Sequence, residues 1–142
     1  MKKIILSFLL CAMLLLSSCN GVSNYKNAPV VGYEESFSQK LEEYVQKTIK
    51  EEWSDVQSYD ITWSEDWSGK YAPSEAELYG SEKPVSCTLT IQMKGETNHF
   101  IFYFAHLNNK LSPKKIVMEE SGNWYEANYD ETQDFIEDIY NG

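Results

Sequence analysis

The stretch VSCTLTIQM at positions 85–93, with the turn KGET at 94–97 and the segment HFIFYFAHL at 99–107, decides the fold class of this chain. From Val85 onward every second residue of the first segment is apolar, which is the pattern of a strand with one buried face. The returning segment is apolar on both faces, which is typical of a central strand covered at least in part on both sides. The stretch therefore predicts antiparallel strands at the centre of the fold.

Shorter segments on either side of this stretch predict the rest of the sheet. Positions 57–63 alternate apolar and polar residues, which predicts a half-buried strand. Positions 115–120 predict a further strand, and positions 124–127 add a short edge strand. We expect an antiparallel sheet of about four or five strands.

Two segments have the periodicity of amphipathic helices. The first opens at Ser36, which together with Gln39 has the form of a capping box. Its apolar stripe consists of Phe37, Leu41, Tyr44, Val45, Thr48, Ile49 and Trp53. A second capping-box candidate, Asn128 with Glu131, precedes a shorter C-terminal helix. The stripe of that helix consists of Phe135, Ile136, Ile139 and Tyr140.

The order of these elements predicts an α+β domain, in which the N-terminal helix packs on a curved antiparallel sheet and a short helix ends the chain. This order resembles that of cystatin-like and NTF2-like domains, and the resemblance concerns architecture alone. Positions 64–84 form a long acidic and aromatic connection, which is unusual in a compact domain and often functional or disordered. Within it, positions 73–79 predict one or two helical turns before Gly80.

The N-terminus has the composition of a targeting segment. Lys2 and Lys3 precede an apolar run at 4–16, which is too short to span a membrane comfortably. The sequence Leu16-Ser17-Ser18-Cys19 that follows resembles a bacterial lipobox, with an aliphatic residue, two small residues and a cysteine.

The lipobox resemblance implies a lipoprotein precursor that is cleaved before Cys19 and carries acyl chains on that residue. Positions 1–18 are then the signal peptide, positions 19–34 are the lipidated cysteine and a flexible tether, and positions 35–142 are a single domain. Two acyl chains anchor a protein stably. We therefore expect an extracytoplasmic protein held at the cell membrane or the outer membrane.

The charge of the chain narrows the choice of partners. The 22 acidic residues exceed the 12 basic ones, which gives a net charge of −10, and the removal of Lys2 and Lys3 makes the chain more acidic still. Such a chain lacks the basic face that nucleic-acid binding requires. The same charge disfavours electrostatic docking on anionic lipid.

Cysteine and histidine positions offer no metal site or disulfide. In the mature lipoprotein that the lipobox resemblance implies, Cys11 is removed with the signal peptide and Cys19 is lipidated, which leaves Cys87 without a disulfide partner. The apolar neighbours of Cys87 favour an inert core thiol. His99 and His106 lie on opposite faces of one predicted strand and cannot share a metal. The sequence thus predicts no metal and no cofactor.

Carboxylates suggest an enzymatic alternative. Glu65 and Asp66 are adjacent, and Glu75 and Glu77 are close, so either group could bind Ca²⁺ or act as an acid–base pair. Neither group has the spacing of an EF-hand loop, and solvated surface charge is the favoured interpretation. The alternative function is a small cell-envelope hydrolase that uses Glu65 or Asp66.

Aromatic residues outside the predicted core suggest a binding surface. Exposed Trp and Tyr side chains are enriched in protein interfaces and sugar platforms. The candidates are Trp67, Tyr71, Tyr79, Trp124 and Tyr125. In the competing interpretation these rings fold back over an open face of the sheet. The leading hypothesis is a non-enzymatic binding or accessory module for a protein, peptide or glycan, and a cystatin-like inhibitory or structural protein is a further alternative.

Overall fold

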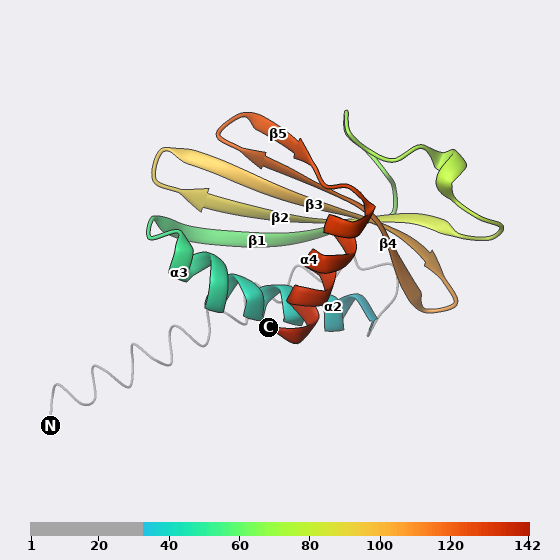
Figure 1. Ribbon diagram of the computed structural model, residues 1–142, viewed down its shortest axis with the longest axis horizontal. Coiled ribbons are helices and arrows are strands. Elements are labelled where there is room, and N and C mark those ends of the chain that lie inside the picture. The colour runs from blue at the N-terminus through green and yellow to red at the C-terminus, as the bar shows by residue number, and fades with distance from the viewer. Residues whose placement is uncertain (1–32) are drawn as a thin grey trace, which may run out of the picture.

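A five-stranded antiparallel sheet in the order β1-β2-β3-β4-β5 organises residues 33–142, the part of the chain that the computed structural model describes (Figure 1). The strands are β1 Val56–Ser64, β2 Lys83–Met93, β3 Glu96–Leu107, β4 Lys110–Glu120 and β5 Asn123–Glu126. The sheet and two helical segments confirm the predicted α+β class. The central position of β3 is also as predicted.

A tight turn makes β4 longer than the sequence predicted. Asn108 and Asn109 both have positive φ values, of 50° and 60°, so the chain reverses within two residues. β4 therefore begins at Lys110 rather than at the predicted position 115. Its first half contains Pro113 and a register shift opposite Tyr103 and Phe104, and this irregular, polar stretch has the composition of a loop.

The N-terminal helical segment consists of α2 Tyr33–Tyr44, a π-helical stretch η2 Val45–Ile49, and α3 Lys50–Glu52. The predicted start at Ser36 was wrong, because the chain is already helical at Tyr33 and Ser36 lies inside the helix. The apolar stripe begins only at Phe37, whereas polar residues that favour helices extend the helix toward the N-terminus.

The π-helical stretch compensates for an apolar repeat of four residues that does not match the period of an α-helix. Phe37, Leu41, Val45 and Ile49 are all buried and are spaced by four residues. In a regular α-helix four residues overshoot a full turn by about 40°, so such a stripe would drift away from the core. Wider i→i+5 turns at η2 reduce this drift and keep the stripe on one side.

The core lies on the side of the sheet that faces the helices. The Phe37 ring of α2 lies 5.4 Å from that of Phe102 and 5.0 Å from that of Phe104, both in T-shaped contacts. The indole N–H of Trp63 on β1 donates to the buried hydroxyl oxygen of Ser38 at 2.9 Å. Burial of each such aromatic side chain contributes about 1.5–3 kcal/mol to folding.

The C-terminal helix α4, Tyr129–Asn141, lies on the same side of the sheet as α2 (Figure 1). Its predicted capping box is confirmed, since the Asn128 side chain accepts from the Glu131 amide and the Glu131 carboxylate accepts from the Asn128 amide. The two helices touch through aromatic rings, with Tyr44 of α2 5.5 Å from Phe135 of α4.

The connection between β1 and β2 covers part of the other face of the sheet. Tyr103 on that face is only 1% exposed, and its hydroxyl donates to the Ser68 carbonyl oxygen at 2.9 Å. The predicted helical turn within the connection is present as a 3-10 turn, η3 Glu75–Glu77, capped by Ser74. The connection is thus a folded part of the domain.

The segment that carries the lipobox resemblance lies outside the described residues, as does the predicted tether up to position 32. Cleavage before Cys19 and lipidation of Cys19 therefore stay predictions. Among residues 33–142 no helix is both long enough and apolar enough to cross a membrane.

Candidate functional site

Hydrogen bonds from its indole N–H hold the Trp67 side chain against the sheet. Its indole N–H donates to the carbonyl oxygen of Phe104 at 2.9 Å and to that of Val85 at 3.2 Å. The two acceptors belong to paired residues of β2 and β3. The side chain therefore fastens the connection to the sheet, which agrees with the interpretation that this ring folds back over it.

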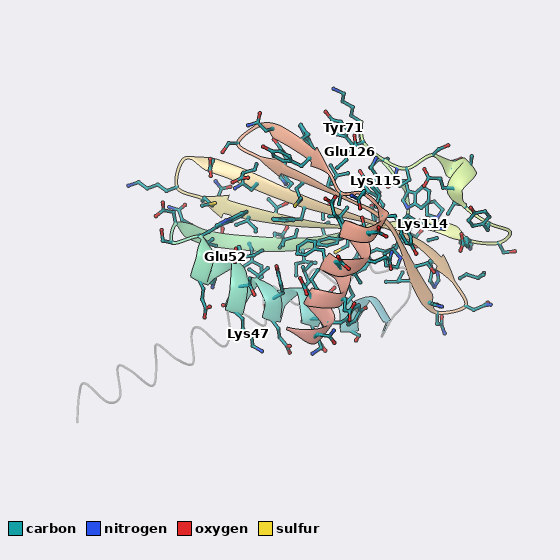
Figure 2. All side chains as sticks on the ribbon, in the orientation of Figure 1. Lys47, Glu52, Tyr71, Lys114, Lys115 and Glu126 are labelled. Carbon is teal, nitrogen blue, oxygen red and sulfur yellow. The ribbon has the colours of Figure 1, made fainter. Side chains whose placement is uncertain are left out.

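Tyr71 and Trp124 form one aromatic surface on the outer face of the sheet. Their ring centroids are 5.2 Å apart, although the residues come from the connection and from β5. Trp124 is 40% exposed, and Lys70 lies over the Tyr71 ring at 5.2 Å (Tyr71 is labelled in Figure 2). The structure thus brings two of the five predicted aromatic residues together.

Tyr79 and Tyr125 lie apart from that pair. Tyr79 is 72% exposed, and the ammonium group of Lys114 lies 4.9 Å from the centroid of its ring. Tyr125 is the residue after Trp124 on β5 and therefore points to the opposite, helix-facing side of the sheet. The five predicted residues consequently do not form one binding surface.

A cleft of about 500 Å³ opens between the helical segments and the helix-facing side of the sheet. It lies among the C-terminal part of α2, η2 and α3 on one side, β3 to β5 on another, and α4 on a third. Five aromatic side chains line it: Tyr44, Trp53, Phe100, Tyr125 and Phe135. Of the residues that the sequence singled out for binding, Tyr125 belongs to this cleft.

Four of these rings form a continuous wall. The Trp53 ring lies 6.1 Å from Phe100, Phe100 lies 6.0 Å from Phe135, and Phe135 lies 5.5 Å from Tyr44. These rings hold one another in place, because each is packed against at least one neighbour in offset or edge geometry. Trp53, Tyr44 and Phe135 are only partly buried, so part of each side chain is exposed.

The polar residues that line the cleft are acidic. They are Glu52 of α3, Glu126 of β5 and Glu131 of α4, and Figure 2 shows Glu52 and Glu126 on separate elements. The pKa of Tyr44 is raised by burial and, to a smaller extent, by the charges of Glu52 and Asp138. This wall of the cleft therefore has a negative electrostatic potential.

A second, polar cavity of about 420 Å³ brings together Glu65, Ser81, Lys83, His106 and Asn108. The Nε2 atom of His106 is buried and has no hydrogen-bond partner in the described chain. Asp66, the other predicted carboxylate, accepts a hydrogen bond from the Ser64 hydroxyl at 2.7 Å. Of the two adjacent carboxylates, only Glu65 therefore lines the cavity that also contains the His106 imidazole.

The remaining candidate residues have structural environments. Cys87 is fully buried, as predicted, and burial raises the pKa of its thiol well above the ordinary value. The imidazole of His99 lies close to Thr90 and Glu119. It is far along β3 from the imidazole of His106. No cluster of three or more His, Cys, Asp or Glu residues suited to a metal ion occurs within residues 33–142.

Sequence reasoning missed most of the cleft because its aromatic residues lie on stripes that also build the core. Tyr44 and Trp53 belong to the helical stripe, and Phe135 belongs to the C-terminal one. A usable signal was present in the helix itself. The four-residue spacing of its apolar residues favours a π-helical stretch, and such stretches often occur at functional sites.

Comparison of the chain with protein-family models, with curated proteins and with solved structures gives no match. The function of the cleft therefore has to be inferred from its own residues.

Proposed function

We propose that this chain is a membrane-anchored extracytoplasmic lipoprotein whose domain is a non-enzymatic binding module. The observation that carries the proposal is the aromatic cleft of about 500 Å³ between the helices and the sheet. Small-ligand sites are concave, mostly apolar, and contain a few polar groups, and this cleft has those properties. In this proposal the cleft holds an apolar group, free or carried by a peptide, protein or glycan.

The anchor is part of the proposal and rests on the sequence Leu16-Ser17-Ser18-Cys19. Replacement of Cys19 by Ala should remove acylation, because this residue carries the acyl chains in the proposed lipoprotein. Metabolic labelling with a fatty acid measures this directly. Retention of label in the Cys19→Ala variant would refute the anchor.

We also propose the architectural resemblance to cystatin-like and NTF2-like domains, in which the helix packs on a curved sheet. It is supported by the contacts of the Phe37 ring in α2 with the Phe102 and Phe104 rings in β3. The proposed binding function does not depend on this resemblance, since a fold does not determine a function.

The binding function can be tested at single-residue resolution in the full-length chain. The chain contains four Trp residues, so labelling with 5-fluorotryptophan gives a small set of ¹⁹F resonances. Trp53 lines the cleft, whereas Trp124 lies on the outer face. The neutral probe 3,3-dimethylbutan-1-ol should shift the Trp53 resonance in a saturable way and leave the Trp124 resonance unchanged.

A cleft-filling variant provides the matched control. Ala127 lines the cleft, so Ala127→Phe should occupy its volume and abolish the response of Trp53 to the probe. Trp124→Ala alters the outer face and should preserve the response of Trp53. If the probe does not shift the Trp53 resonance, or if Trp124→Ala rather than Ala127→Phe removes the response, the cleft is not the binding site.

The cavity at Glu65 and His106 favours a second candidate, the small cell-envelope hydrolase. A carboxylate and an imidazole in one polar cavity are groups that can act as general acid and base. This candidate predicts turnover of cell-wall or glycan fragments that Glu65→Gln abolishes, while Asp66→Asn leaves the turnover unchanged. Absence of turnover by the wild-type chain would eliminate it.

A further inference from the structure

The charged residues that line the cleft are all of one sign. Within the described chain the lining contains Glu52, Glu126 and Glu131, and it contains no Lys, Arg or His. Two of these carboxylates already have partners. Glu126 forms an ion pair with Lys115, and Glu131 accepts from the amide of Asn128 at 2.8 Å. Glu52 has no ion-pair partner among residues 33–142 and is exposed, so its charge is available to a ligand.

The aromatic rings of the cleft also lack a cation. Elsewhere in the described chain, three rings carry a Lys ammonium group on their faces: Tyr59 with Lys50, Tyr71 with Lys70, and Tyr79 with Lys114. None of the cation–π pairs found in residues 33–142 involves a ring of the cleft. A cation placed on the face of Trp53 or Tyr44 would be attracted by the ring quadrupole and by Glu52 together.

We propose that the cleft selects an organic cation, namely an alkylated ammonium group. Its apolar substituents pack on the wall formed by Trp53, Phe100, Phe135 and Tyr44, and its charge faces Glu52. This inference rests on the proposed function, because it names the ligand class of the same cleft. The electrostatic influence of Glu52 and Asp138 on Tyr44 is consistent with it.

An alkylated ammonium fits the cleft better than the primary ammonium of a Lys side chain does. A primary ammonium is compact and strongly hydrated, and its transfer into an apolar cleft requires the loss of much of that hydration. Alkyl groups remove N–H donors and add apolar surface that the rings can cover. A phosphate next to the ammonium, as in phosphocholine, would be repelled by the carboxylates.

The test compares choline with its neutral carbon isostere, 3,3-dimethylbutan-1-ol, on the full-length 5-fluorotryptophan-labelled chain. The two molecules share their shape and differ in charge, so the ratio of their dissociation constants measures selection for a cation. From the strength of a partly desolvated cation–π interaction we expect choline to bind about tenfold more tightly. Phosphocholine should bind more weakly than choline.

Two neighbouring carboxylates provide a matched pair of variants. Glu52→Gln should weaken choline binding about fivefold and leave binding of the isostere unchanged, because only the cation interacts with that charge. Glu51→Gln changes the net charge equally, yet Glu51 does not line the cleft, so choline affinity should be preserved. An unchanged near-ultraviolet circular dichroism spectrum shows that each variant is folded.

The outcomes separate this inference from the proposed function. If choline and the isostere both shift the Trp53 resonance with equal affinity, selection for a cation is refuted and the binding function is retained. If neither molecule shifts it, both are refuted. Equal loss of choline affinity in Glu51→Gln and Glu52→Gln would show that net charge, and not the cleft, attracts the cation. Phosphocholine binding as tight as choline binding would also overturn the inference.

Discussion

Replacement of Trp67 by Phe tests whether the long connection is held on the sheet by one hydrogen-bonding group. The variant keeps an aromatic ring and removes the indole N–H, which is shared between the carbonyl oxygens of Val85 and Phe104. Both of these residues are 2% exposed, so water does not readily replace the lost donor. A net hydrogen bond contributes about 1 kcal/mol, and a buried acceptor without a donor costs about 1–3 kcal/mol.

We therefore expect Trp67→Phe to lower the free energy of unfolding by about 2 kcal/mol. For a domain of this size that change lowers Tm by about 8 °C. Urea denaturation followed by far-ultraviolet circular dichroism measures the free energy. Limited proteolysis with trypsin adds a local measure, because Lys70 lies in the connection and should be cleaved faster once Trp67 no longer holds it.

Trp124→Phe is the matched control for this experiment. It makes the same chemical change at a side chain that is 40% exposed and whose indole N–H donates to no group within residues 33–142. We expect a loss below about 0.5 kcal/mol. If both variants lose the same stability and Lys70 is cleaved at an unchanged rate in Trp67→Phe, the shared hydrogen bond does not hold the connection.

Two further predictions concern stability and the buried thiol. Asn128→Ala removes the reciprocal cap of α4 and should lower the free energy of unfolding by about 1 kcal/mol in urea titrations, whereas Asn141→Ala, at the far end of α4, should have little effect. Burial raises the pKa of Cys87 well above its ordinary value and also raises the pKa of Tyr103. Because both groups hold their protons more tightly in the folded chain than in the unfolded one, their contribution to stability is complete below about pH 8 and is lost as the pH rises through 9 to 10 and above. Unfolding free energies measured across that range should therefore fall, and a flat profile together with rapid thiol labelling of native Cys87 would contradict its burial.

The strands were predictable because their burial pattern is local. Alternation along positions 85–93 and two-sided apolar character along 99–107 indicate which strand is central, and the sheet order confirms it. The cap at Asn128 and Glu131 was predictable for the same reason, since both partners lie within one helical turn. Local patterns failed where no apolar period exists, as at the start of α2 and in the first half of β4.

The candidate site was predictable only in part. Sequence composition identified the surplus of aromatic residues and of carboxylates, but it assigned Trp53 and Phe135 to the core and grouped Trp124 with Tyr125. Consecutive residues of a strand point to opposite faces. On β5 the Trp124 ring therefore contacts Tyr71, whereas the Tyr125 ring lines the cleft. Partial burial depends on what the neighbouring elements leave uncovered, and a periodicity does not carry that information.

The sequence by itself determined the α+β class, the central strand, the burial of Cys87 and the acidic character of the chain, because each follows from composition or from short-range periodicity. Only the tertiary structure decided which aromatic residues line the cleft. Residues of α2, α3, β5 and α4 that are far apart in sequence meet around the cleft, and Trp67 is withdrawn from the surface by acceptors on β2 and β3. Such contacts arise from the packing of helices against a particular side of the sheet, and no local pattern specifies that packing.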